Sequence, residues 1–123
     1  MVERVVINGK KYPVFMGTNT MRIYKSTFDG NFLQDVSKAA VLNDDSQPVL
    51  DMSIAVNVAY ASIADGFRRV SQPFDMTPED LADQFDEDLD AIGRIFDLMP
   101  KFGIFKNLSK EEVKSLGKQK GAN

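Results

Sequence analysis

The fold is decided by residues 5–16, which read Val5-Val6-Ile7-Asn8-Gly9-Lys10-Lys11-Tyr12-Pro13-Val14-Phe15-Met16. Asn and Gly are the two residues that most readily accept a positive φ, which both central positions of a type I′ turn require. That turn matches the twist of two antiparallel strands, and an apolar run lies on each side of it here. The sequence therefore predicts an N-terminal β-hairpin.

A lone hairpin is only marginally stable in water, so other elements must cover one of its faces. After Gly17 the chain has the pattern of helices and loops throughout. We therefore expect an α+β fold, with the N-terminal β-hairpin packed on a mostly helical domain that has a long central helix. The length predicts a single domain over residues 1–116. The polar residues 117–123 are predicted to form a disordered tail.

The strongest helix prediction covers residues 48–70. Pro48 suits the first turn of a helix, where its missing N–H costs nothing. Apolar residues then recur at steps of three and four on a wide stripe that is typical of a buried helix, namely Val49, Met52, Val56, Tyr60, Ile63, Phe67 and Val70. A narrow polar edge is expected from Asn57, Asp65, Arg68 and Arg69.

Other helices are predicted from their start and stop signals. One begins with Thr18 or Asn19 as N-cap and ends before Asp29-Gly30, and a second covers residues 32–41. Thr77-Pro78-Glu79-Asp80 has the N-cap, the proline and the acids of a helix start, and the apolar pattern continues to Pro100. A last helix is predicted from Ser109, with Glu112 completing a capping box.

Composition argues against several classes of function. The chain has no Cys, which excludes a disulfide framework or thiolate metal site, and no His, the commonest general base. We therefore expect a non-enzymatic protein without cofactor or metal. The net charge is −3, whereas nucleic-acid binding requires clustered Lys and Arg. No apolar run is long enough to cross a membrane, so we expect neither nucleic acid nor membrane as a partner.

One acidic stretch has part of a calcium-binding pattern. Asp86, Asp88 and Asp90 have the spacing that begins an EF-hand loop. That loop requires Gly at its sixth position and Glu at its twelfth, where this chain has Ala91 and Asp97. A solvated acidic helix face is the favoured interpretation. A pair of carboxylates such as Asp83 and Asp86 could in principle serve in acid–base catalysis, but no other residue supports a cleft around them.

An apolar segment between two predicted helices is the candidate binding site. It comprises Met99, Phe102, Ile104, Phe105 and Leu108. Apolar residues between helices usually close a core, and this is the simpler interpretation. The alternative is an adaptable surface for a partner helix, because Met and Phe suit binding in grooves.

Several short motifs resemble those of a known family. The start Val5-Val6-Ile7-Asn8-Gly9-Lys10-Lys11-Tyr12, followed by Phe15-Met16-Gly17-Thr18-Asn19-Thr20-Met21-Arg22, resembles the opening of tail assembly chaperones from long-tailed phages and prophages of Gram-positive bacteria. The turn at Thr27-Phe28-Asp29-Gly30-Asn31-Phe32, the helix with Tyr60-Ala61 and the start at Thr77-Pro78-Glu79-Asp80 are similar in order. Pro13 and the Phe-rich residues 96–105 depart from the family pattern.

The resemblance implies a role without catalysis. Such chaperones bind the long, helical, aggregation-prone tape measure protein in the host cytoplasm, help bring tail tube protein to it, and are absent from the mature virion. The family often makes a longer product by frameshifting, and residues 117–123 would suit that junction. A small intracellular adaptor or antitoxin-like protein with one folded partner is the alternative. Self-association is left open, and an enzyme that uses carboxylates is the least favoured reading.

Overall fold

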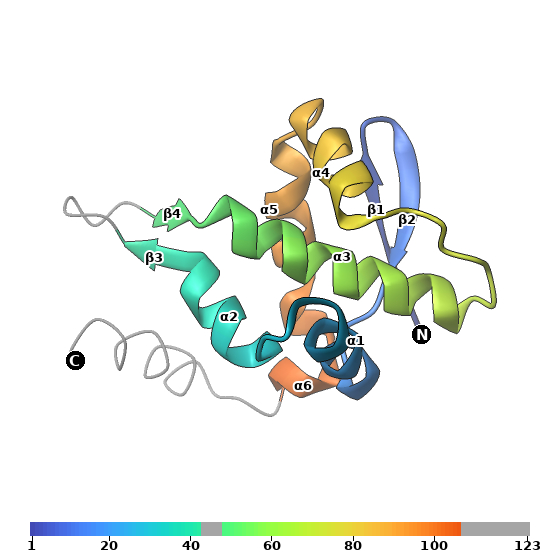
Figure 1. Cartoon of the computed structure of the whole chain (residues 1–123), viewed down its shortest axis with the longest axis horizontal. Helices are drawn as coiled ribbons and strands as arrows, with labels where there is room; N and C mark the ends of the chain where they lie inside the picture. The colour runs from blue at the N-terminus through green and yellow to red at the C-terminus, as the bar shows by residue number, and fades with distance from the viewer. Residues whose placement is uncertain (43–47, 107–123) are drawn as a thin grey trace.

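The structure is a computed structural model, and it describes residues 1–42 and 48–106. The α+β fold is confirmed, with an N-terminal hairpin followed by helices around a long central one (Figure 1). The elements are β1 (Glu3–Ile7), β2 (Lys10–Val14), α1 (Thr18–Phe28), α2 (Phe32–Ala39), β3 (Ala40–Leu42), β4 (Pro48–Leu50), α3 (Met52–Arg69), α4 (Pro78–Asp86), α5 (Asp90–Phe96), the 3₁₀ helix η1 (Met99–Lys101) and α6 (Gly103–Lys106).

The predicted hairpin forms with the predicted turn. Asn8 and Gly9 both have positive φ, at 50° and 81°, as a type I′ turn requires. Val5 pairs with Tyr12, and both are buried. Pro13 lies opposite Arg4, one position beyond that pair. Because bonded and non-bonded pairs alternate along an antiparallel ladder, Pro13 falls at a non-bonded position and the ladder loses no donor.

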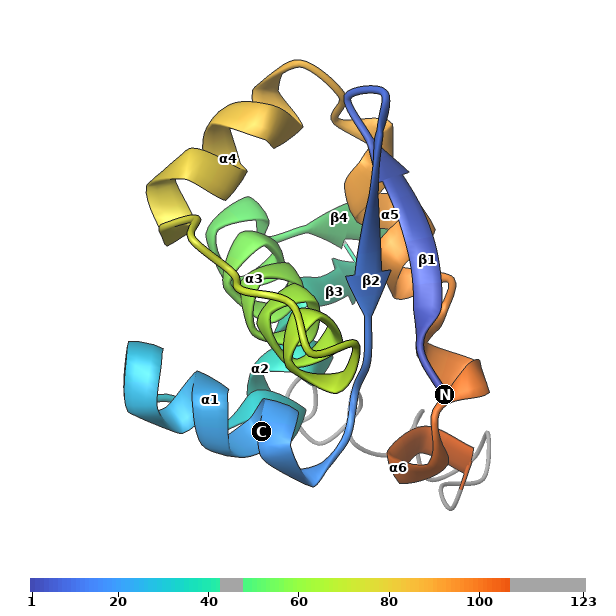
Figure 2. The same ribbon diagram turned by 90° about the vertical axis from the view of Figure 1, so that its right-hand side faces the viewer.

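Helix α3 is the centre of the core. Strand β2 and helices α1, α2 and α4 all pack against it, and α5 packs against both β1 and α3 (Figure 2). Ala55, Val58, Ala59 and Ile63 of this helix are fully buried. A helix in contact with this many neighbours needs small residues at its closest approaches, which accounts for the alanines among its buried positions.

Gly66 is the point of closest approach between α3 and the hairpin. A Cβ atom at this position would overlap the carbonyl of Pro13 in β2. One turn earlier, the Ser62 carbonyl accepts a hydrogen bond of 3.0 Å from the N–H of Phe15. The backbone of the hairpin is therefore joined directly to the backbone of the central helix.

Two predictions around residue 48 are wrong. The chain after Gly17 is not all helix and loop, because β3 and β4 form a second hairpin that pairs Val41 with Val49. Pro48 is the first residue of β4, and α3 starts only at Met52. Asp51 is its N-cap and accepts a hydrogen bond from the N–H of Ile54. An aspartate N-cap satisfies a free helix N–H, which a proline at the start cannot do.

The acidic helix starts as predicted but ends early. Thr77 caps α4 with Asp80 in a reciprocal capping box, and Pro78 is the first residue. The predicted helix to Pro100 is instead α4, α5 and η1, separated by turns. The first break falls at Asp88, whose side chain accepts a hydrogen bond from the backbone N–H of Asn8 in the hairpin. A tertiary contact therefore replaces continuation of the helix.

Two smaller corrections concern the other helices. The N-cap of α1 is Gly17, one residue before the predicted Thr18. Helix α2 ends at Ala39, because the next residues enter β3. The helix predicted from Ser109 and the tail 117–123 lie outside the described residues.

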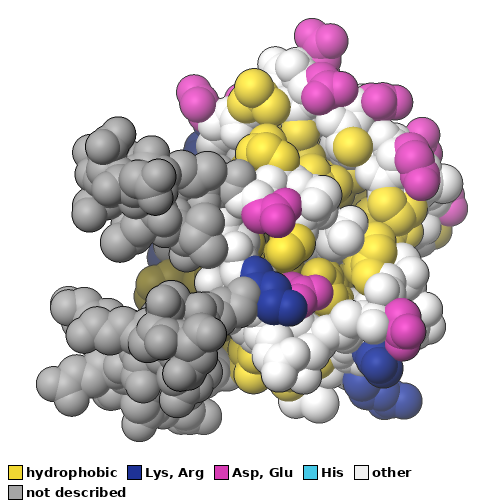
Figure 3. Space-filling model, turned by 60° about the vertical axis from the view of Figure 1, so that its left-hand side comes forward, with side chains coloured by type: hydrophobic (Ala, Val, Ile, Leu, Met, Phe, Trp, Pro, Cys, Tyr) yellow, Lys and Arg dark blue, Asp and Glu magenta, His cyan; other side chains and the backbone are white. Residues whose placement is uncertain are grey.

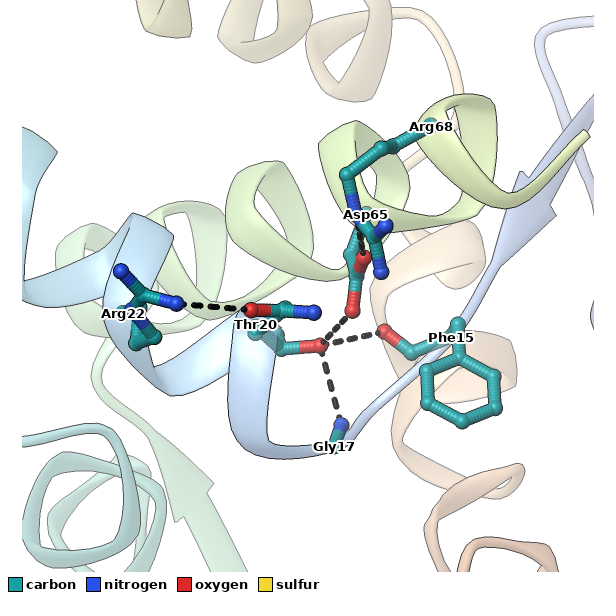
Figure 4. A network of polar contacts seen from close by, with 7 residues as sticks. Phe15, Gly17, Thr20, Arg22, Asp65 and Arg68 are labelled. Atoms are coloured by element: carbon teal, nitrogen blue, oxygen red, sulfur yellow. Dashed lines mark hydrogen bonds and ion pairs between the residues drawn. The ribbon is translucent and has the colours of Figure 1, made fainter. Parts of the chain in front are cut away.

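Asp65 does not lie on the predicted polar edge of α3. Its side chain is fully buried and is held by Arg68 at 2.8 Å and by the Thr20 hydroxyl at 2.7 Å (Figure 4). The same hydroxyl accepts a hydrogen bond from the Gly17 N–H and lies 3.0 Å from the Phe15 carbonyl oxygen. A buried carboxylate is tolerable only when it is paired and hydrogen-bonded in this way. The network ties the start of α1 to α3.

The first prediction tests the close approach at Gly66. Gly66→Ala should lower the free energy of unfolding by about 1–3 kcal/mol, because the added methyl group must push β2 away from α3. The measurement is urea unfolding followed by circular dichroism, since the chain has no Trp. Gly93→Ala is the control: Gly93 lies in α5 with open space around it, so stability should rise by about 0.5–1 kcal/mol. Equal effects of the two substitutions would contradict the packing described.

The second prediction tests the network at Asp65. Thr20→Val keeps the shape of the side chain but removes the hydroxyl that joins Asp65 to Gly17. It should cost about 1–3 kcal/mol, because buried polar groups then lose their partner. Thr20→Ser retains the hydroxyl and should cost about 1 kcal/mol, the value of one buried methyl group. Thermal and urea unfolding would measure the free energy of unfolding of the two variants. A Thr20→Val variant as stable as wild type would refute the role of the Thr20 hydroxyl.

Candidate functional site

The predicted binding segment lies partly in the core. Phe102 is only 3% exposed, and its ring packs edge-on against Phe15 with centroids 5.4 Å apart. Met99, Ile104 and Phe105 are half-buried against the core, and Leu108 lies outside the described residues. Phe102 thus fits the simpler interpretation of core closure. A binding role for the other side chains stays a prediction.

A groove between α3 and α4 is the better candidate site. Its volume is about 340 Å³ and it is mostly apolar. It is lined by Met52, Ser53, Val56, Asn57, Pro78, Glu79, Ala82, Phe85, Asp86 and Leu89. None of these residues belongs to the segment predicted from the sequence.

Large exposed hydrophobic side chains gather at this groove. In the part of the chain that the structure describes there are four, and two of them, Met52 at 41% and Leu89 at 59%, line it. Figure 3 shows a band of hydrophobic side chains across this side of the molecule, with acidic side chains along its upper edge. Met52 and Leu89 therefore offer a ligand in the groove large apolar side chains to contact.

The rim of the groove is acidic. Glu79 and Asp86 lie on the α4 side, and in residues 1–42 and 48–106 no Lys or Arg lines the groove. Helix α4 carries four acids, Glu79, Asp80, Asp83 and Asp86, and no basic residue. A ligand in the groove would therefore meet apolar contacts below and negative charge at the side.

The N-terminal hairpin and α3 hold the α4 wall in place. The side chain of Asn8, in the hairpin turn, donates to the Gln84 side chain of α4 at 3.1 Å. The backbone N–H of Asn8 donates to Asp88 at 2.9 Å, and Arg94 holds the same carboxylate at 2.7 Å. At the other end, the Tyr60 hydroxyl of α3 donates to the Met76 carbonyl just before the α4 cap. The fold therefore holds the outer wall of the groove, helix α4, in place at both of its ends.

The same contacts involve the motif that has the spacing of an EF-hand loop. Asp88 accepts hydrogen bonds from Asn8 and Arg94 at a turn, so our expectation that it lies on a solvated helix face is wrong. Within residues 1–42 and 48–106, no group of three or more acids, His or Cys is arranged to hold a metal ion. Asp83 and Asp86 are both exposed on α4.

Elsewhere in the described residues, the buried phenol of Tyr24 joins two helices, and two arginines line a hollow. Burial, together with a 2.7 Å hydrogen bond to Asp35, raises the pKa of Tyr24 well above its ordinary value. The phenol stays protonated and ties α1 to α2. A polar hollow of about 590 Å³ is lined in part by Arg68 and Arg69. Arg68 already pairs with Asp65, and the Arg69 guanidinium lies 3.5 Å from the centroid of the Phe15 ring.

Comparison with models of known protein families, with curated proteins and with solved structures finds no match for this chain. In residues 1–42 and 48–106, no helix combines the length and the hydropathy that crossing a bilayer requires. The geometry of the groove and the resemblance of the motifs are therefore the observations on which a functional proposal can be built.

The third prediction concerns the contact that positions Leu89. The N–H of Asn8, helped by Arg94, holds the pKa of Asp88 below its ordinary value of 3.8. A carboxyl with a lowered pKa in the folded state stabilises the fold above its ordinary pKa, and this stability is lost as the pH falls through the lowered value. Asp88→Asn should therefore be less stable than wild type at pH 7.

The difference between wild type and Asp88→Asn should shrink as the pH falls below 3.8, because the Asp88 carboxyl is then protonated in the unfolded chain and, at still lower pH, in the folded protein as well. Urea midpoints measured from pH 7 to pH 2.5 would follow this change. Asp83→Asn removes an exposed charge from α4 and serves as the control for the change of net charge. A pH-independent difference would refute the role of the Asp88 charge.

Proposed function

We propose that this protein is a non-enzymatic tail assembly chaperone of a long-tailed phage or prophage. In this role it binds the tape measure protein and helps recruit tail tube protein in the host cytoplasm, without entering the mature virion. The proposal combines the motif resemblance with one structural observation, the exposed apolar groove between α3 and α4. The resemblance supplies the class of partner, and the groove supplies a surface that such a partner could use.

The chemistry of the groove suits a helical client. A long helical protein without its final partners exposes apolar stripes, and these stripes drive its aggregation. An apolar groove between two helices is a common acceptor for such a stripe. The exposed side chains of Met52 and Leu89 provide adaptable contacts, since Met in particular fits irregular surfaces. Binding of this kind shields a client without any chemical step.

A rigid scaffold beneath the groove supports the same role. The α4 wall is fixed at both ends by Asn8 and by Tyr60, and the core beneath it is continuous. A chaperone that must release its client benefits from a surface that is already formed, because no ordering entropy is then lost at each cycle of binding.

The fourth prediction tests this function directly. The tagged full-length chain, purified from the bacterium that carries its gene during phage or prophage induction, should bring down the tape measure protein. Tail tube protein should accompany it, and mass spectrometry would identify both. In co-expression, the tape measure protein should move from the insoluble to the soluble fraction when this chain is present.

Two controls define failure. An unrelated tagged protein of similar size and charge should recover neither tail component. Recovery of a single compact host protein at fixed stoichiometry would overturn the proposal and favour the adaptor or antitoxin-like alternative. A tape measure protein that is equally soluble with and without this chain would also count against a chaperone role.

A further inference from the structure

We propose that the groove between α3 and α4 binds an amphipathic helix that carries Lys or Arg along one edge of its apolar stripe, two turns apart. This inference rests on the proposed function and names the chemistry of the client segment. Three features of the described residues carry it: the size of the groove, the apolar side chains of its two walls, and the sign and spacing of its charges.

The size of the groove suits a few side chains. Its volume is about 340 Å³. A cavity of about 150 Å³ accommodates a benzene-sized group, so the groove has room for two side chains of the size of Leu or Phe. Neighbouring side chains on one helix face, at i and i+4, project close enough together to enter such a groove as a pair.

The apolar wall on the α4 side combines residues of the helix with Leu89. Pro78, Ala82 and Phe85 of α4 line the groove, and Leu89 lies beyond the end of the helix, at the start of α5. Phe85 is itself buried in the core, so Leu89 gives this wall its large exposed apolar side chain. The facing wall on α3 has Met52 and Val56, one turn apart. A helix placed between these walls would complete a local three-helix packing, with Leu89 and Met52 covering its sides.

The charges determine which helix fits. Glu79 and Asp86 lie seven residues apart on α4, which is about two turns and roughly 10 Å along its axis. Both lie beside the apolar wall, and none of the described residues that line the groove is basic. A client helix running alongside α4 would pair with them through Lys or Arg at positions i and i+7. An acidic helix would be repelled at the same two points.

The fifth prediction uses a designed peptide as the probe. It is a fluorescein-labelled helical peptide of about 18 residues, long enough for five turns, with Leu on a heptad stripe and Lys at i and i+7 beside it. Titration with the full chain at low salt, followed by fluorescence anisotropy, should show saturable binding. A matched peptide with Glu in place of those Lys residues should bind at least about tenfold more weakly, because like charges then face each other.

Matched variants locate the site. Asp86→Lys and Asp83→Lys change the same helix by the same charge, but only Asp86 lines the groove. The first should weaken peptide binding by about tenfold, and the second should leave it within about twofold. Leu89→Ser should also weaken binding, whereas Val6→Thr, at an exposed position outside the groove, should not. Melting curves would verify that each variant is folded.

Several outcomes would overturn the inference. Equal loss with Asp86→Lys and Asp83→Lys would reduce the effect to net charge. Residues 107–123, which lie outside the described part, contain Lys110 and Lys114. If Lys110→Glu and Lys114→Glu in the full chain tightened peptide binding, these residues would be competitors of the peptide, and the groove would be assigned to the C-terminal residues of the same chain. Concentration-dependent dimerisation that is abolished by Leu89→Ser would assign it to a second copy.

The inference on the groove and the proposed chaperone function can fail independently of each other. If Leu89→Ser recovers the tape measure protein as well as wild type does, the chaperone role stands and the groove inference falls. If the basic peptide binds as described but no tail component is recovered from the host, the groove inference stands and the function is different.

Discussion

The contact between the N-terminal hairpin and the bare backbone of α3 at Gly66 is the constraint on which the rest of the structure depends. A two-stranded hairpin has too little surface to be stable alone, so its buried face must lie directly on the central helix. The missing side chain at Gly66 permits this approach, and the Ser62 carbonyl receives the Phe15 N–H at the same place. The buried pair of Asp65 and Thr20 then directs the chain into α1.

The same hairpin positions the candidate site at its other end. Its turn residue Asn8 bonds both Gln84 and Asp88, and so determines where α4 stops and how Leu89 is presented. A groove whose outer wall is fixed by contacts distant in sequence is part of the architecture of the domain. The hydrophobic surface left exposed there is therefore held open by the fold, with acids along one edge.

Sequence patterns were most informative where the physics is local. The Asn8-Gly9 turn needs only the φ preferences of two residues, and the Thr77 cap needs only residues within one turn, so the sequence predicts both correctly. The sequence does not predict the start of α3, because Pro48 suits a helix start and a strand edge equally well, and pairing with β3 decides between them. Nor does it predict the end of α4, because a contact across the fold, from Asn8, interrupts an otherwise continuous pattern.

The candidate site, too, depends partly on local sequence and partly on contacts across the fold. The sequence by itself determined the class of fold, the wide apolar stripe of the central helix and the acidic character of α4, because each depends on composition and on spacing within one segment. Only the tertiary structure decided that Phe102 belongs to the core, that Asp65 is buried, and that Met52 and Leu89 meet across one groove. Residues 37 positions apart become neighbours through packing, and no periodicity within a single helix contains that information.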